Sequence, residues 1–262
     1  MSNIYLTVTV GPDYRLLPYF LRYYKDLGIK NFLVILNTPD TAPIRILQEN
    51  GINPVKIWTD PFSEKLKQFH ERDVILRHCS DNDWVVYSDL DEYQYYPAGI
   101  EHQIEYSEKV GIDFIEGKLI DRVSKTGELV KLNEGLSLNE QFPLGGYLTG
   151  ALLKAWDKKI TAAKGKLIVG GGHHIFLDNA SYKTLPYKKK LNKHSKGNEI
   201  HHFKWDRDVL IRMNRSLILQ DESLSCWRKE IIQFLKHYDK YNRINIHDKK
   251  FKFKTVKNMI MI

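Results

Sequence analysis

Residues 83–93 read Asp-Trp-Val-Val-Tyr-Ser-Asp-Leu-Asp-Glu-Tyr, a short apolar run that leads directly into three carboxylates. The apolar part is typical of a strand that is buried on both faces of a sheet. Asp89 and Asp91 are two residues apart, so in an extended chain their side chains point the same way. Closely spaced carboxylates repel one another, and a divalent cation, Mn²⁺ or Mg²⁺, relieves that repulsion. We therefore predict a metal site at this turn; the alternative is a solvated acidic turn.

The sequence before this run alternates strand and helix patterns. Strands are predicted at residues 4–10, 31–36 and 54–58, and helices at residues 16–27, 44–50 and 62–79. Such alternation predicts an α/β fold with a parallel sheet and right-handed crossovers. Ligands of open α/β sheets bind beyond the carboxyl ends of the strands, which is where the acidic turn follows.

The pattern becomes less regular after residue 97. We predict strands at 114–120 and 167–169, loops at 121–147 and 187–196, helices at 206–219 and 225–238, and a loose strand or unpacked arm at 249–257. No clean linker interrupts the chain. We therefore expect one catalytic domain, residues 1–220, followed by a basic helical extension, residues 221–262, that packs on it or trails from it.

Composition excludes several classes of protein. The chain has 262 residues, of which 42% are hydrophobic and 12% aromatic, so wholesale disorder is excluded. It has no apolar stretch long enough to span a membrane, and its N-terminus does not resemble a secretory signal. Two cysteines, Cys79 and Cys226, form no disulfide framework and are interpreted as reduced thiols. These features predict a cytoplasmic protein.

Charge is divided unevenly along the chain. Residues 1–150 contain 15 Lys/Arg and 22 Asp/Glu, whereas residues 151–262 contain 25 and 10. The surplus lysines could line a diphosphate site, attract the protein to an anionic membrane surface, or bind nucleic acid. Nucleic acid is disfavoured, because no recognisable binding motif is present and the acidic half would repel a phosphate backbone. For the lysine-rich tail, a solvated surface is the simplest interpretation.

Two segments carry a family resemblance. The helix that ends in Leu27-Gly28-Ile29 before the apolar run Phe32–Ile35, and the spacing from Trp84 to Asp89-Leu90-Asp91-Glu92-Tyr93, resemble GT-A-fold, nucleotide-sugar-dependent glycosyltransferases of the family-2-like and family-92-like branch. The resemblance covers residues 4–97 well and residues 112–205 more loosely. It departs at Pro12-Asp13, where that branch has an Asn-Glu pair.

The resemblance implies a GT-A (Rossmann-like) fold, with a mixed, mainly parallel sheet flanked by helices. It implies a metal-dependent enzyme that transfers a sugar from a nucleotide-diphosphate sugar to an acceptor hydroxyl, in surface glycan synthesis. Asp89 and Asp91 would hold the metal together with a late histidine, for which His202 is preferred to His201. The donor would lie at the ends of the first three strands. Its expected contacts are Gly11, Asp13, Asn37, Asp60 and Asp89. Asn37 and Asp60 also suit plain turns.

An inverting transfer needs a general base near the acceptor hydroxyl. Glu140 is preferred as this base, with Asp121 as second choice. The alternative role of Glu140 is to start a helix, and that of Asp121 is an ion pair with Arg122. A retaining enzyme needs no such base. His173-His174 follows a glycine run that could approach a phosphate or sugar, or form a turn.

The acceptor is expected to be a glycan or a lipid-linked molecule, with peripheral contact at the inner face of an anionic membrane. Alternative functions are a non-catalytic nucleotide- or glycan-binding protein and a metal-dependent nucleotidyltransferase or phosphohydrolase.

Overall fold

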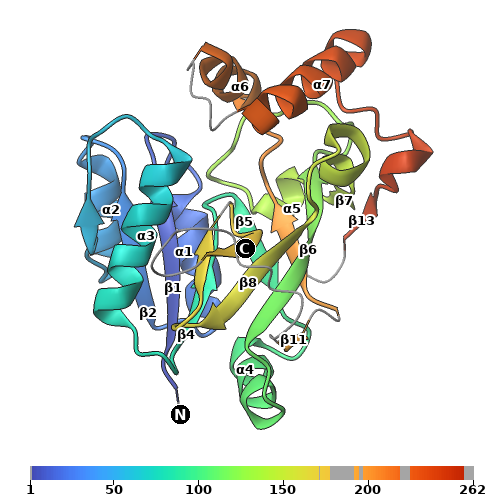
Figure 1. Ribbon diagram of the computed structural model, residues 1–262. Coiled ribbons are helices and arrows are strands. Elements are labelled where there is room, and N and C mark those ends of the chain that lie inside the picture. The colour runs from blue at the N-terminus through green and yellow to red at the C-terminus, as the bar shows by residue number, and fades with distance from the viewer. Residues whose placement is uncertain (1, 171, 178–191, 195–196, 219–224, 257–262) are drawn as a thin grey trace. The chain divides into compact units, whose positions relative to one another are not determined.

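The computed structural model describes residues 2–170, 172–177, 192–194, 197–218 and 225–256 (Figure 1). The chain divides into two compact units, one formed by residues 1–117 and 158–199 and the other by residues 118–157 and 200–262. Most of the predicted lysine-rich loop at 187–196 lies outside the described residues. In the part of the chain that is described, no helix is long and apolar enough to cross a membrane.

The first unit is built on a mixed, mostly parallel sheet. Its four parallel strands are β1 (Ile4–Val10), β2 (Asn31–Leu36), β3 (Lys56–Ile57) and β4 (Trp84–Tyr87). They lie in the order β4-β1-β2-β3, and β8 (Lys158–Lys164) continues the sheet antiparallel to β4. β6 (Phe114–Val123) follows β8 and runs on into the second unit. The predicted α/β, Rossmann-like fold class is confirmed.

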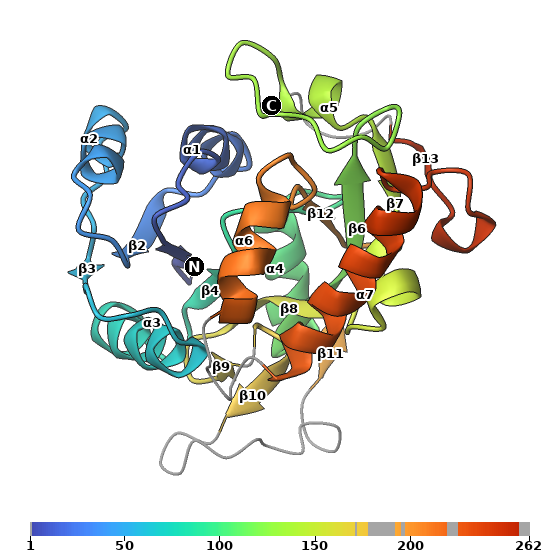
Figure 2. The same ribbon diagram turned by 90° about the horizontal axis from the view of Figure 1, so that it is seen from above.

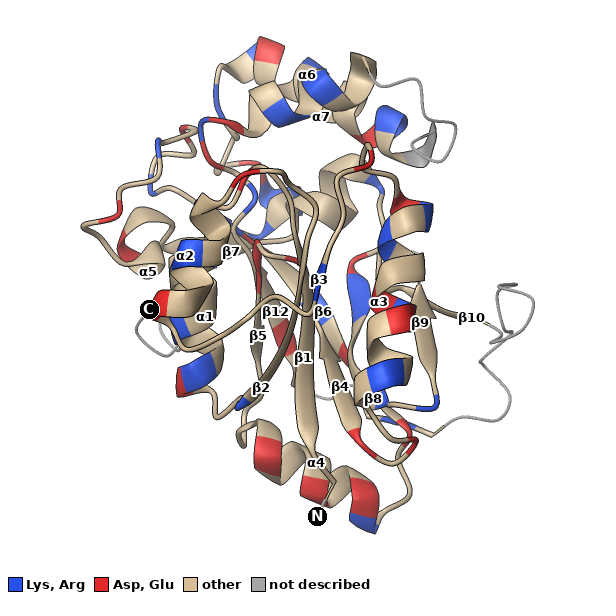
Figure 3. Cartoon of the chain, turned by 90° about the vertical axis from the view of Figure 1, so that its left-hand side faces the viewer, with Lys and Arg blue, Asp and Glu red and all other residues tan. Residues whose placement is uncertain are grey.

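Helices cover both faces of this sheet. α1 (Leu17–Asp26) and α2 (Ala42–Glu49) lie on one face, and α3 (Glu64–His78) lies on the other (Figure 2). Ser63 caps the start of α3. Its Oγ accepts a hydrogen bond from the Leu66 amide at 3.2 Å and so satisfies one free N–H of the first turn. Acidic and basic residues are interspersed along α3 (Figure 3), and two of them, Lys67 and Glu71, are buried together with apolar residues of the same helix.

Several elements of the first unit were absent from the sequence prediction. They are β5 (Glu92–Tyr95), α4 (Ile100–Lys109), β8, β10 (Ile175–Leu177) and β11 (Lys193–His194), whereas β9 (Ile168–Gly170) was predicted. β5 and β8 escape the apolar pattern because they bury polar side chains. Glu92 and Lys159 are both buried, and each has a charged partner inside the unit.

The second unit contains strands where loops were expected. β6 extends to Val123, β7 (Leu144–Gly146) pairs antiparallel with it, and a short helix, α5 (Leu138–Gln141), lies between them. The segment 121–147, which was predicted to be rich in loops, therefore has strand residues near both of its ends and contains the short helix α5. β12 (Glu199–His202) brings the chain back from the first unit, and a π-helical segment, η1 (Thr149–Leu153), follows β7.

The C-terminal helices pack into the core of the second unit. α6 (Val209–Ile218) and α7 (Ser225–Tyr241) share one apolar cluster, in which the rings of Trp205 and Phe234 lie 4.7 Å apart. Beyond α7, the 3-10 turn η4 (Lys249–Phe251) buries Phe251, and β13 (Lys254–Thr255) pairs with β7. The tail at residues 249–257 was expected to be a loose strand or an unpacked arm, and its described part contains the strand β13. The functional division at residue 220 stays a prediction.

One glycine of this unit has a required conformation. Gly127 has φ +77°, and its carbonyl oxygen accepts a hydrogen bond of 2.8 Å from the Ile244 amide. A side-chain carbon at this position would collide with the Ile244 carbonyl. Only glycine meets both conditions, and it allows the segment after α7 to lie directly on the Gly127 turn.

Candidate active site

The acidic segment forms a tight turn between β4 and β5. The Glu92 amide donates to the Asp89 carbonyl at 3.0 Å, and Ser88 Oγ donates to the Glu92 carbonyl at 2.8 Å. Ser88 and Glu92 are buried, whereas Asp89 and Asp91 are partly exposed. The turn therefore places the carboxylates directly at the carboxyl end of β4, as the sequence predicted.

Two buried lysines hold Asp89 from both sides. Lys67 of α3 donates to Asp89 Oδ1 at 2.5 Å, and Lys159 of β8 donates to Asp89 Oδ2 at 2.7 Å. Lys159 also donates to Glu92 Oε1 at 2.5 Å. Both lysine side chains are at most 10% exposed, so these ion pairs are largely shielded from water. Each oxygen of the Asp89 carboxylate thus accepts a hydrogen bond from an ammonium group, one from a helix and one from a strand that are far apart in sequence.

Burial and ion pairing oppose each other in this cluster. Burial alone would raise the pKa of Asp89 and lower the pKa of both lysines. The attraction of Lys159 and Lys67 outweighs burial and holds the pKa of Asp89 well below its usual range. The same pairs raise the pKa of Lys67 and of Lys159. All three groups are therefore charged at neutral pH.

A second acid, Glu71, connects this cluster to His173. Glu71 lies one helical turn after Lys67, with its Oε1 3.9 Å from Lys67 Nζ, and accepts a hydrogen bond from Thr9 Oγ1 at 3.0 Å. Burial would raise the pKa of Glu71, but Lys67 and His173 lower it. His173 Nε2 lies 3.6 Å from Glu71 Oε2. The buried His173 ring therefore lies beside a buried carboxylate that also faces Lys67.

His173 has an unusual backbone. Its φ is +67°, a left-handed conformation that costs a non-glycine residue about 1 kcal/mol or more, and Gly172 before it has φ +63°. The Gly172 amide donates to Glu64 Oε1 at 3.0 Å, which fixes this loop to the start of α3. The next residue, His174, points its protonated Nδ1 at the Lys158 carbonyl, 2.7 Å away. Burial lowers the pKa of His174 to about 4, so its ring is neutral at pH 7.

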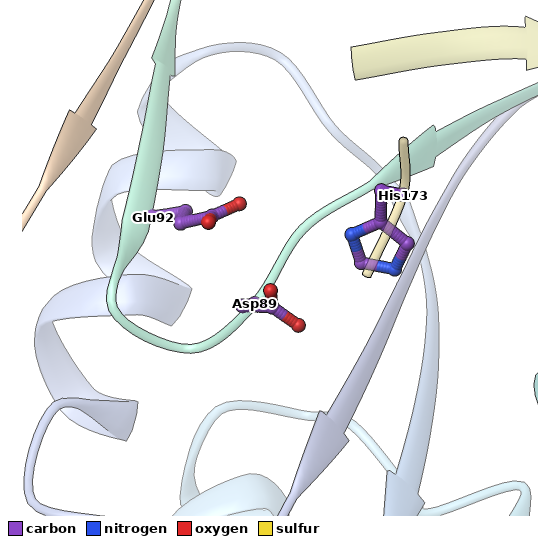
Figure 4. A group of neighbouring side chains, drawn as sticks. All are labelled: Asp89, Glu92 and His173. Atoms are coloured by element: carbon purple, nitrogen blue, oxygen red, sulfur yellow. The ribbon is translucent and has the colours of Figure 1, made fainter. Parts of the chain in front are cut away.

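Asp89, Glu92 and His173 could hold a metal ion. One oxygen or nitrogen atom from each lies within 4.8 Å of the others, and Figure 4 shows the three side chains on the acidic turn, β5 and the loop before β10. Within the described residues, Glu92 Oε2 and both ring nitrogens of His173 are buried without a hydrogen-bond partner. Native proteins rarely leave buried polar atoms unsatisfied. Two carboxylates and an imidazole suit Mn²⁺ or another divalent cation, so these three side chains fit as metal ligands.

The predicted donor contacts lie at the strand ends of the first unit. Asn37, directly after β2, joins these strand ends. Its backbone amide donates to the Val10 carbonyl at 2.8 Å, and its Nδ2 donates to the Asp60 carbonyl at 3.0 Å. Gly11 is partly exposed, with open space where a Cβ would stand. Asp13 forms an exposed ion pair with Arg15 at 2.7 Å. The structure thus brings Asn37 and Asp60 together.

The other predicted residues lie in the second unit. Asp121 is fully buried, and its oxygens accept hydrogen bonds from the Thr149 amide and hydroxyl at 2.6 and 2.7 Å and from Trp205 Nε1 at 2.9 Å. His202 Nδ1 lies 3.1 Å from Asp121 Oδ1. Burial would raise the pKa of Asp121, but these bonds, that of His202 first, lower it. Glu140 is exposed and forms a capping box with Ser137 at the start of α5.

Asp89 and Asp91 belong to the first unit and His202 to the second, so a metal site shared by these three stays a prediction. The predicted roles of Gly11, Asp13, Asn37, Asp60, Asp121 and Glu140 also stay predictions.

Sequence reasoning missed Lys67, Glu71 and Lys159 and did not choose between His173 and His174. Lys159 lies 70 residues after Asp89, and no local signal indicates that the two will pair. The glycine run before His173 was a signal, since it permits the left-handed backbone seen there.

No family model matches the chain, and no curated protein matches its sequence. Solved structures that align with it include 4-diphosphocytidyl-2C-methyl-D-erythritol synthase, with 12% identity, 63% of this chain and 76% of that chain covered, and a TM-score of 0.37. HddC from Yersinia pseudotuberculosis aligns with 10% identity, 79% and 96% coverage and a TM-score of 0.40.

A third, CMP:2-keto-3-deoxy-manno-octonic acid synthetase complexed with CTP, has 12% identity, 91% and 86% coverage and a TM-score of 0.34. At these identities and TM-scores we draw no functional argument from the similarity. Two of these structures are of a synthase and a synthetase, and none of the three establishes the resemblance to glycosyltransferases.

Proposed function

We propose that this chain is a metal-dependent glycosyltransferase that transfers a sugar from a nucleotide-diphosphate sugar to an acceptor hydroxyl. One observation carries the proposal. Beyond the carboxyl end of β4, Asp89, Glu92 and His173 converge from three elements. Glu92 and His173 have buried oxygen or nitrogen atoms without a hydrogen-bond partner, and these atoms could bind a metal. The strained backbone of His173 supports it, because strain of this kind gathers at functional sites.

In this proposal, Asp89, Glu92 and His173 would hold Mn²⁺ or Mg²⁺. Asp91 and His202, which the sequence analysis proposed as ligands together with Asp89, remain further candidates. The bound cation would stabilise the negative charge that develops on the leaving nucleoside diphosphate. Lys67 and Lys159 supply two more positive charges beside the same carboxylate. The strand ends at Gly11, Asn37 and Asp60, with Asp13 beside them, would bind the nucleotide.

For the acceptor, we propose Glu140 as general base of an inverting reaction. Asp121 is the second choice, because it would have to give up hydrogen bonds to Thr149 and Trp205 to accept a proton. Its contact with His202 suits it better to orienting that ring. A glycan or lipid-linked acceptor at the inner face of a membrane, and a cytoplasmic location, also belong to this proposal.

The test has two steps. Mn²⁺ binding is first measured by electron paramagnetic resonance on wild-type protein, Glu92→Gln, His173→Ala and the control His78→Ala, whose side chain is exposed at the end of α3. We expect Glu92→Gln and His173→Ala each to weaken Mn²⁺ binding about tenfold or more, and His78→Ala to match wild type. Equal binding by all four proteins would refute this ligand set.

The second step identifies the substrate. A panel of nucleotide sugars is screened with Mn²⁺ by thermal shift, followed by measurement of donor hydrolysis. A true donor at a hundredfold excess over Kd should stabilise the fold by about 2.7 kcal/mol. Stabilisation by nucleoside triphosphates alone, with release of pyrophosphate in the presence of a sugar phosphate, would favour the nucleotidyltransferase alternative instead. Binding without turnover would favour a non-catalytic binding protein.

A further inference from the structure

Lys159 occupies the place that a cation would take between two of the proposed metal ligands. Its ammonium group lies 2.7 Å from Asp89 Oδ2 and 2.5 Å from Glu92 Oε1. The side chain is 10% exposed and comes from β8, the strand next to β4. One protonated amine thus joins two carboxylates that would otherwise repel each other inside the protein.

We propose that Lys159 takes the place of the divalent cation in the metal-free protein. Its ammonium group holds Asp89 and Glu92 together and releases them when the metal binds. Its released ammonium group then binds a phosphate oxygen of the diphosphate substrate. This inference rests on the proposed metal site at Asp89, Glu92 and His173.

Charge balance explains why such an exchange is useful. Contacts join three carboxylates, those of Glu71, Asp89 and Glu92, to the two ammonium groups of Lys67 and Lys159. These five groups together carry one net negative charge, which would repel a diphosphate. A divalent cation changes their sum to one net positive charge, which attracts it. Binding of the metal thus reverses the sign of the cluster without adding a new side chain.

Lys159 is better placed for this exchange than Lys67. Lys67 contacts only one of the three proposed ligands, Asp89, and has Glu71 within 3.9 Å on its own helix as a second partner. Both carboxylates that bind Lys159 are proposed ligands. A cation bound to Asp89 and Glu92 would therefore repel and compete with Lys159 first.

The test compares Mn²⁺ binding, with the metal as the only ligand, in wild type, Lys159→Met, Lys159→Arg and Lys158→Met. Lys158 is the exposed neighbour and serves as the control. We expect Lys159→Met to bind Mn²⁺ about tenfold or more tightly than wild type, because the competing charge is gone. Lys158→Met should equal wild type, and Lys159→Arg, which keeps the charge, should not gain affinity.

Inorganic pyrophosphate at saturating Mg²⁺ provides the second readout. Here Lys159→Met should bind about tenfold more weakly than wild type, opposite to its effect on the metal. A lysine with a purely structural role would not shift the two affinities in opposite directions. Equal or weaker Mn²⁺ binding by Lys159→Met overturns this inference while leaving the metal site intact. Lack of Mn²⁺ binding by all four proteins overturns the metal site, and this inference with it.

A measurement on wild-type protein covers the case in which Lys159→Met does not fold. Lysine ε-carbons are labelled with ¹³C, and the signal of residue 159 is assigned by its loss in Lys159→Arg. Addition of Mg²⁺ should move this signal, since the ammonium group leaves its two carboxylates. An unchanged Lys159 signal at saturating Mg²⁺ overturns the inference.

Discussion

Replacing Asp89 by Asn removes the charge that holds both buried lysines while keeping the size of the side chain. Lys67 loses an ion pair of 2.5 Å and Lys159 one of 2.7 Å. Loss of one partner from a buried ion pair costs about 3–5 kcal/mol. Asp89 is 28% exposed, and Glu71 and Glu92 still face the lysines, so we expect the lower end, about 3 kcal/mol. For a chain of this size that corresponds to a fall in Tm of about 6–12 °C.

The assay is thermal unfolding followed by circular dichroism in the presence of EDTA, so that metal binding does not contribute. Asp81→Asn is the matched control, because Asp81 is an exposed acid on the loop before β4. We expect Asp81→Asn to change stability by less than about 0.5 kcal/mol. A Tm of Asp89→Asn equal to that of Asp81→Asn would refute the argument that the lysines depend on this carboxylate.

Three further predictions concern the second unit. Because the pKa of Asp121 is lowered in the folded protein, its contribution to stability is present above its unfolded pKa of about 3.9 and is lost as the pH falls through the folded value. In Asp121→Asn, the free energy of unfolding measured with urea should therefore fall less steeply with decreasing pH in this range than in wild type. Gly127→Ala should cost about 3 kcal/mol or more by urea unfolding, whereas Gly111→Ala, also at positive φ but with open space around it, should cost about 1–2 kcal/mol; equal losses would contradict the clash. Glu140→Gln should lower kcat about a hundredfold or more if Glu140 is the base. The control Ser137→Ala also breaks the helix cap, and it should lower stability by only about 1 kcal/mol and leave kcat near the wild-type value.

The first 90 residues were predictable because strands and helices there follow simple periodic patterns. β1 and β2 match their predicted ranges, and the acidic turn was placed correctly at the end of β4. Two of the strands that were missed, β5 and β8, have polar sequences. β8 reads Lys-Lys-Ile-Thr-Ala-Ala-Lys, and it is buried because Lys159 finds partners in β5 and the acidic turn. Such a strand is recognisable only when its partners are known.

The candidate site was predictable in its acids and not in its counter-charges. Asp89 follows an apolar strand, so its position could be derived locally. Lys67 and Lys159 reach it from 22 and 70 residues away, and no periodic pattern relates them to it. The uneven charge of the two sequence halves is also redistributed by folding. The first unit combines 11 Lys/Arg and 18 Asp/Glu from residues 1–117 with 10 and 2 from residues 158–199, giving 21 against 20.

The chain leaves the first unit after residue 117 and returns to it at residue 158, which has a consequence for the order of synthesis. Glu71, Asp89 and Glu92 leave the ribosome with Lys67 as their nearby cation, and the whole segment 118–157 is made before Lys159 follows. A nascent chain that ends before residue 159 therefore lacks the ammonium group that joins Asp89 to Glu92 in the folded protein. The charged core of the first unit closes only after part of the second unit has been translated, so the two units mature in an interleaved order.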